Sequence, residues 1–184
     1  MARVFHVVEK VEIPEDVTVE VDGLRVTVKG PKGTVTRDFS HARGVFIRLE
    51  DRIVIVETFI ADRRQKALVG TIAAHIRNMI TGVVRGYRYK LKIIFSHFPI
   101  TVSVDEKNKV VRIRNFMGEK SDRIAKIYGN VKVKVSGEDI TIEGVDIEEV
   151  GLTAASIERA TRVTDRDRRV FMDGIYIYEK GEAL

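Results

Sequence analysis

The stretch from Ala61 to Lys92 gathers side chains that bind anions. Residues 61–104 carry eight lysines and arginines against one acid, whereas residues 1–60 and 105–149 each carry one more acid than base. Cations without neighbouring carboxylates neutralise phosphates readily, so the stretch predicts contact with a polyanion. The alternative is a solvated charged face that has no ligand. The candidate contacts in this stretch are Arg63, Arg64, Arg77, Arg85, Arg88 and Lys90.

A second basic region lies near the C-terminus and consists of arginines mixed with acids. Guanidinium groups can fork onto phosphates or bases while neighbouring acids order the loop. The alternative is a network of surface ion pairs with Glu158, Asp165 and Asp167, which would add little to stability. The candidate contacts in this region are Arg159, Arg162, Arg166, Arg168 and Arg169.

A third candidate is the turn at residues 29–33, which reads Lys-Gly-Pro-Lys-Gly. Two glycines and two lysines on one turn are superficially like a loop that cradles phosphate. The turn lacks the length and the following helix of a P-loop, so nucleotide binding is not favoured. We expect an exposed hairpin whose Lys29 and Lys32 either contact a nucleic-acid backbone or have no ligand.

Residues that could support catalysis or metal binding do not form a convincing set. Ser96 and His97 are sequence neighbours, and in an extended segment their side chains point to opposite faces. The acids between residues 138 and 149 fit a solvated turn and a helix N-terminus better than a metal site. The chain has no cysteine, and none of its four histidines is spaced as a zinc-binding pair. Neither an enzyme nor a bound cofactor or metal is therefore predicted.

Composition limits the possible partners further. The chain of 184 residues is 44% hydrophobic and 32% charged, enough for one ordinary core or for two small ones. A sequence pI near 9.4 favours polyanions, with nucleic acid first and an acidic membrane second. No apolar run approaches the roughly 18 residues that a membrane span requires, and the first twenty residues alternate rather than form a signal peptide. A cytosolic protein is expected.

The basic stretch is predicted to be a helix followed by a strand. Leu68, Ile72 and Ile76 recur at helical spacing over residues 62–81, and Asp62 with Gln65 forms a capping pair at the start. Gly82 suits the left-handed position just past the helix. Residues 87–92 then alternate, which places Arg88, Lys90 and Lys92 together on one cationic face of a strand.

The order of short strands, one helix and one strand occurs twice along the chain. The second helix is predicted from residue 146, with Asp146 and Glu149 as its capping pair. Residues 69–76 and 150–157 share Val, Gly, Ala, Ala and Ile at matching positions, which predicts an internal duplication. The alternative is that amphipathic segments of any antiparallel domain look alike. The predicted strands cover residues 18–21, 24–29, 34–39, 45–49, 53–56, 87–92, 100–104, 110–114, 131–135, 140–142 and 174–178.

This pattern predicts an α+β fold made of two tandem copies of a small antiparallel sheet with one packed helix. The first copy is expected at residues 1–84 and the second at residues 85–184, with the boundary falling somewhere within residues 84–99.

Five segments together resemble the large-subunit ribosomal protein L6 family. They are Ile-Pro-Glu-Asp-Val-Thr-Val at 13–19, Val-Lys-Gly-Pro-Lys-Gly at 28–33, Asn-Met-Ile-Thr-Gly-Val at 78–83, Phe-Ser-His at 95–97 and Arg-Val-Phe-Met-Asp-Gly-Ile-Tyr at 169–176. The resemblance covers nearly the whole chain. The last segment is similar to the archaeal and eukaryotic branch of the family rather than to the bacterial branch.

The resemblance implies two tandem α+β units, no enzymatic activity and no small-molecule substrate, cofactor or membrane partner. It implies binding to large-subunit ribosomal RNA near the sarcin-ricin loop and the stalk base, mostly through the C-terminal copy. Neighbouring ribosomal proteins and nearby translation factors are the other expected partners, in the cytoplasm. The alternative is a non-ribosomal RNA-binding or protein-interaction module built from the same duplicated unit.

Overall fold

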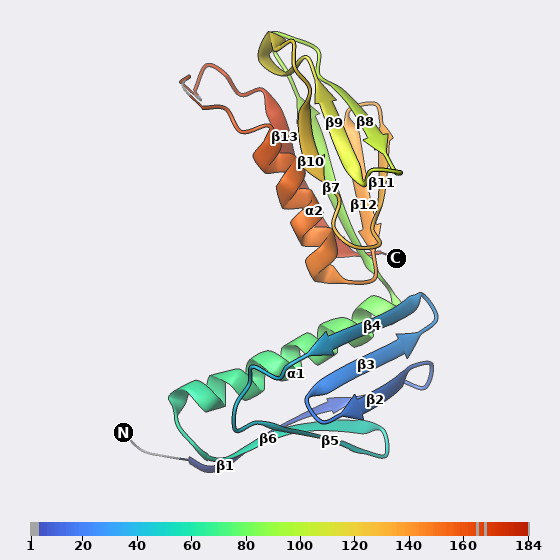
Figure 1. Ribbon diagram of the computed structural model, residues 1–184, viewed down its shortest axis with the longest axis vertical. Helices are drawn as coiled ribbons and strands as arrows, with labels where there is room; N and C mark the ends of the chain where they lie inside the picture. The colour runs from blue at the N-terminus through green and yellow to red at the C-terminus, as the bar shows by residue number, and fades with distance from the viewer. Residues whose placement is uncertain (1–3, 165, 168, 184) are drawn as a thin grey trace. The chain divides into compact units, whose positions relative to one another are not determined.

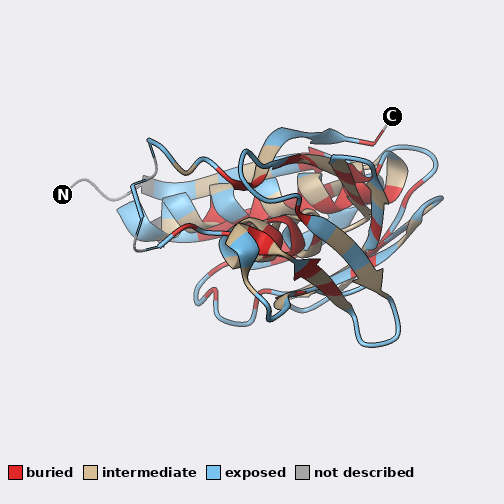
Figure 2. Cartoon of the chain, turned by 90° about the horizontal axis from the view of Figure 1, so that it is seen from above, coloured by how far each residue is buried: buried red, intermediate tan, exposed pale blue. Residues whose placement is uncertain are grey.

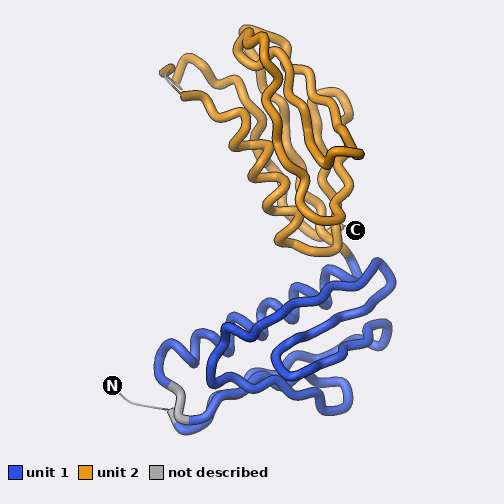
Figure 3. The backbone as a smooth tube through the Cα atoms, viewed as in Figure 1, with its two compact units in different colours: residues 1–85 blue, residues 86–184 orange. Residues whose placement is uncertain are grey.

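The computed structural model describes residues 4–164, 166–167 and 169–183, without the side chains of residues 4, 60 and 61. The chain forms two compact units, residues 1–85 and residues 86–184 (Figure 3). Antiparallel strands and one α-helix make up each unit, which confirms the predicted α+β class. The strands of each unit form two sheets, however, where a single sheet was expected.

Unit 1 packs one long helix against two three-stranded antiparallel sheets (Figure 1). One sheet has the strand order β1-β6-β5, and the other has the order β2-β3-β4. The bounds are β1 (Val4–Glu12), β2 (Thr18–Asp22), β3 (Arg25–Gly30), β4 (Gly33–Asp38), β5 (Phe46–Glu50), β6 (Ile53–Ala61) and α1 (Arg63–Val84).

The start of α1 agrees with the sequence, but its end does not. The Asp62 carboxylate accepts from the Gln65 N–H at 2.8 Å, and the Gln65 side chain accepts from the Asp62 N–H at 3.1 Å. This reciprocal pair satisfies two backbone donors that the first turn leaves open. The helix runs through Gly82 to Val84, and the left-handed residue beyond it is Gly86, with a φ of 75°. The prediction that Gly82 ends the helix is therefore wrong.

The apolar stripe of α1 lies in the core of unit 1. Val69, Ile72 and Ile76 are almost fully buried, and Figure 2 shows buried residues alternating with exposed ones along the helices. Among the described residues, α1 alone is long and apolar enough to span a membrane by length and composition. The expectation that no stretch reaches this length is wrong, since Arg77 is the only charge between residues 67 and 84. Its packing on the sheets is that of a core helix.

Unit 2 combines a three-stranded sheet in the order β10-β9-β8 with a four-stranded sheet in the order β11-β12-β7-β13. The bounds are β7 (Tyr87–Ile94), β8 (Thr101–Asp105), β9 (Val110–Arg114), the 3-10 turn η1 (Phe116–Gly118), β10 (Arg123–Lys126), β11 (Lys132–Ser136), β12 (Asp139–Gly144), α2 (Ile147–Ala160) and β13 (Gly174–Glu182). The strand expected at residues 87–92 is β7, which pairs with β12 and β13 inside unit 2.

The helix of unit 2 starts with half of the predicted capping pair. The Asp146 carboxylate accepts from the Glu148 N–H at 2.8 Å. Glu149 does not complete the pair, because its carboxylate accepts from the Asn130 N–H at 3.0 Å and so fastens the loop before β11. Val150, Ala154 and Ile157 face the core of this unit and are fully buried.

Candidate nucleic-acid interface

The cations of β7 lie on the outer face of the four-stranded sheet, where acids from the adjacent strands pair with them. Arg88 donates to Glu143 at 2.7 Å, Lys90 to Glu179 at 2.9 Å and Lys92 to Asp139 at 3.3 Å. In the first and third cases the partner is the residue directly opposite on β12. The positive charge that is concentrated in sequence is thus largely balanced in the fold, and the strand is not the open cationic face that its sequence predicts.

The titration of the two lysines follows from this pairing. Hydrogen bonding to Glu179 raises the pKa of Lys90, and hydrogen bonding to Asp139 raises the pKa of Lys92. A raised lysine pKa adds stability that is fully present at neutral pH and disappears as the pH rises through the raised value, above about 10.4. At physiological pH these ammonium groups remain bound to their carboxylates.

The arginines of α1 occupy three different settings. Arg77 on the exposed face pairs with Glu9 of β1 at 3.2 Å. Arg85 caps the end of the helix through its own N–H, which donates to the Thr81 carbonyl at 2.8 Å. Arg63 and Arg64 are exposed in the first turn, where positive charge opposes the helix dipole. Helix stability therefore does not account for these two arginines, and they stay candidates for ligand contact.

The lysine-glycine turn packs against the end of α1. The Lys32 N–H donates to the Val83 carbonyl at 2.9 Å, and the Lys32 ammonium donates to the Arg85 carbonyl. These are carbonyls that the last helical turn cannot satisfy by itself. Gly30 fits close to Val83, since a Cβ there would lie 2.6 Å from Val83 Cγ2. Lys29 pairs with Glu20 at 2.6 Å, so both lysines have partners within unit 1.

The C-terminal arginines have a different environment from the cations of β7. We call residues 161–173, which join α2 to β13, the arginine loop. The side chains of Arg159, Arg162, Arg166 and Arg169 are exposed, and none forms an ion pair with an acid among the residues that the structure describes. Asp165 and Arg168 lie outside the described residues.

The two described acids of this region accept hydrogen bonds from backbone N–H groups. Glu158 accepts from the Ile177 N–H at 3.3 Å, and Asp167 accepts from the Arg169 N–H at 2.9 Å. The arginines are therefore left open to solvent, and the ion-pair alternative has no support within the described part of the loop.

The base of the arginine loop is fixed to the rest of unit 2. Thr161 is buried and accepts from the Ile175 N–H at 2.9 Å, and Asp173 is buried and accepts from the Ser96 N–H at 2.8 Å. The Phe171 ring lies 5.0 Å from the His97 ring and carries the Arg166 guanidinium 4.9 Å above its centre. The loop thus presents its arginines from a rigid base, which lowers the entropy lost on binding.

Arg123 on β10 holds the end of α2 in place. Its guanidinium donates to the Ala160 carbonyl at 2.8 Å and forks onto Glu119 at 2.6 and 2.8 Å. The hydrogen bond from Arg123 lowers the pKa of Glu119. The pair therefore adds stability above the ordinary glutamate pKa of about 4.3 and loses it as the pH falls through the lowered value.

Replacing Arg123 with methionine is expected to lower the free energy of unfolding by about 1 kcal/mol, because a helix carbonyl and a carboxylate lose their donor. Amide hydrogen exchange at residues 161–164 should accelerate in the same variant. Arg114→Met is the matched control, since within the described residues the ion pair of Arg114 is with the exposed Asp122, at 3.2 Å. Equal melting temperatures and equal exchange in the two variants would contradict a positioning role for Arg123.

A groove of about 400 Å³ opens beside the arginine loop. Phe116, Met117 and Val163 supply an apolar surface, and Arg166 brings positive charge to it, whereas the Arg123 guanidinium is paired with Glu119, which also lines the groove. Such a combination suits a base or ribose on the apolar side and a phosphate on the charged side. No metal-binding group of His, Asp and Glu side chains occurs among the described residues.

Two candidate contacts escaped the sequence analysis. Lys132 and Lys134 are exposed on β11 and form no ion pair within the described ranges. Their signal is the alternation Lys-Val-Lys-Val over residues 132–135, which places both lysines on one face of a strand. Segment net charge concealed them, because residues 105–149 carry more acids than bases in total.

Comparisons with known proteins agree with this architecture. A family described as ribosomal protein L6 matches residues 13–86 and 98–174, two segments that correspond to two tandem repeats. A protein of Desulfurococcus amylolyticus is 95% identical over 184 residues, covering all of both chains. A protein of Staphylothermus marinus is 67% identical over 183 residues, or 99% of each chain, and one of Archaeoglobus fulgidus is 52% identical over 175 residues, or 92% of this chain and 88% of the relative. All three relatives are named large ribosomal subunit protein uL6.

Proposed function

The chain belongs to the ribosomal protein L6 family, and we propose on this basis that it is a structural component of the large ribosomal subunit in the cytoplasm. Its partners in this role are ribosomal RNA and other ribosomal proteins. The family is not enzymatic, and the chain takes part in translation by shaping the subunit.

The finer proposal is that the chain binds ribosomal RNA near the sarcin-ricin loop and the stalk base, where translation factors dock. The observation that carries RNA binding is the exposed set of arginines on and beside the arginine loop, which form no ion pair with the acids that the structure describes. Guanidinium groups on a rigid base can fork onto phosphates and stack on bases, so a folded RNA fits them better than a flexible strand. Arg63 and Arg64 on unit 1 are proposed as additional contacts.

Co-sedimentation tests this function directly. The purified chain should bind protein-depleted large subunits of Desulfurococcus amylolyticus and stay bound at raised salt, because shape complementarity to a folded RNA contributes affinity beyond the phosphate contacts that salt weakens. Footprinting of the bound RNA should show protection at the sarcin-ricin loop and the stalk base. Equal affinity for unstructured oligonucleotides of any sequence, without retention on subunits, would instead indicate a general RNA-binding module and would contradict the proposal.

A further inference from the structure

An apolar groove of about 270 Å³ lies between α2 and β10 in unit 2. Ile124 of β10 and Tyr128 just beyond it line one side, and Leu152 and Ala155 of α2 line the other. The three large side chains among these are 41% to 56% exposed, so apolar surface gathers here that the core of the unit does not cover. Clustered apolar surface of this kind marks a place where something binds. We call it the α2–β10 groove.

Hydrogen bonds to two hydroxyls of α2 hold the sides of the groove together. The Lys126 N–H donates to the Ser156 hydroxyl, and the Tyr128 N–H donates to the Thr153 hydroxyl, both at 3.0 Å. The Thr153 hydroxyl in turn donates to the Glu149 carbonyl at 2.8 Å. The strand and the helix are therefore fixed to each other, and a ligand does not have to order the groove before it binds.

The charge at the groove is positive. Arg159 lines it from α2, two helical turns after Leu152, and Lys126 follows Ile124 at the next alternate position of β10. Both cations are exposed, and neither forms an ion pair among the described residues. No acid lines the groove, and Glu158, the neighbour of Arg159, accepts from a backbone N–H of β13. A ligand that complements the groove therefore carries negative charge beside an apolar group.

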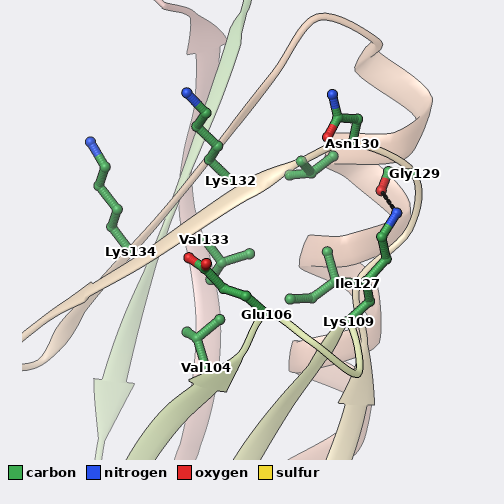
Figure 4. Close-up of a pocket in the computed structure, with 10 residues that line it drawn as sticks. Val104, Glu106, Lys109, Ile127, Gly129, Asn130, Lys132, Val133 and Lys134 are labelled. Atoms are coloured by element: carbon green, nitrogen blue, oxygen red, sulfur yellow. Dashed lines mark hydrogen bonds between the residues drawn. The ribbon is translucent and has the colours of Figure 1, made fainter.

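The hollow beside β11 lacks this combination. Figure 4 shows Lys132 and Lys134 pointing away from the apolar lining of that hollow, beside which Glu106 stands. Its cations and its apolar surface thus face different ways. In the α2–β10 groove, by contrast, Ile124 and Lys126 leave the strand on the same side, so one ligand reaches both.

We propose that the α2–β10 groove docks a protein segment in which one or two large apolar residues are flanked by aspartate or glutamate. The apolar side chains cover Ile124, Tyr128 and Leu152, and the carboxylates pair with Arg159 and Lys126. The inference uses the proposed function only for its setting, since the partner meets the chain on the large subunit. It is another ribosomal protein or a protein that visits the subunit during translation.

The chemistry of the lining favours a protein over RNA. Bases stack on aromatic rings or on guanidinium planes, whereas Ile124 and Leu152 offer branched aliphatic surface. The centres of protein–protein interfaces are apolar and are enriched in tyrosine and arginine, as this groove is in Tyr128 and Arg159. Arg159, which lies on α2 and not in the arginine loop, is thereby assigned to the protein partner.

Site-specific photo-cross-linking tests the inference on the full chain. p-Benzoylphenylalanine replaces the exposed Leu152, and the chain is added with the extracted proteins to protein-depleted large subunits of Desulfurococcus amylolyticus. Irradiation of these subunits, and of subunits translating in a cell-free extract, should give a cross-linked protein peptide with aspartate or glutamate next to apolar residues. Adding Arg159→Glu should lower the yield per subunit-bound chain about fivefold or more. The matched control is Lys107→Glu, which reverses an exposed cation between β8 and β9 and should leave the yield unchanged.

The inference is overturned by cross-links to RNA alone or by the absence of any protein cross-link in both settings. A protein cross-link whose yield does not respond to Arg159→Glu, or whose peptide lacks an acid, overturns it as well. Ile124 is a second position for the cross-linker, and equal melting temperatures confirm that the variants are folded. Failure of the wild-type chain to bind the subunits would instead overturn the proposed function, so the two failures are distinguishable.

Discussion

Replacing Arg162, Arg166 and Arg169 with lysine is expected to lower the affinity for large-subunit ribosomal RNA by about tenfold to a hundredfold, with the melting temperature unchanged. The substitution keeps the charge, so a purely electrostatic contact would be preserved. An ammonium cannot reproduce the two-pronged hydrogen bonding or the stacking of a guanidinium. Each tenfold loss of affinity corresponds to a loss of about 1.4 kcal/mol of binding free energy. Stability should change little, because these exposed side chains make no ion pair within the described residues and a lysine at position 166 keeps a cation above the Phe171 ring.

The measurement pairs thermal unfolding of the free protein with its affinity for a large-subunit RNA fragment. Arg25→Lys/Arg43→Lys/Arg52→Lys is the control, because it changes three exposed arginines of unit 1 in the same way. Affinity lost at constant stability supports direct contact. If stability fell while affinity per folded molecule stayed at the wild-type value, the arginines would act through ion pairs, with Asp165 as the remaining partner, and RNA contact would be excluded.

Local features of the fold were predictable because their causes are local. The reciprocal bonds of Asp62 and Gln65 depend on residues three apart, and the buried stripe of α1 follows from helical spacing. The short strand β10 was missed, since four residues give too little alternation to distinguish a strand from a loop. The Lys126 N–H of this strand donates to the Ser156 hydroxyl of α2 at 3.0 Å, and such a tertiary bond leaves no trace in a sequence window.

The candidate site was less predictable because charge balance is tertiary. Glu143 and Glu179 lie 55 and 89 residues from the cations that they pair with, so a count over residues 61–104 could not include them. The opposite error arose near the C-terminus. There Glu158 and Asp167 were counted against their arginine neighbours, yet both carboxylates bind backbone N–H groups. Segment net charge thus overstated the cationic character of β7 and understated that of the arginine loop.

Reversing Arg88 and Lys90 to glutamate is expected to lower the melting temperature, because each new carboxylate would face Glu143 or Glu179 across the sheet. Arg88 is only 33% exposed and Glu143 only 30%, so solvent screens this repulsion less than it would at an open surface. Sequence alone indicates that such a variant would fold normally, since it places both cations on an open face.

A charge swap separates this structural role from RNA contact. Adding Glu143→Arg and Glu179→Lys to the reversed variant restores opposite charges in both rows, and the melting temperature should return most of the way to the wild-type value. Affinity for large-subunit RNA, measured per folded molecule, should then be close to wild type, because the sheet has regained its net charge and the arginine loop is untouched. If stability recovered while affinity remained tenfold or more below wild type, Arg88 and Lys90 would have to touch phosphates themselves, and their pairing with the acids would be secondary.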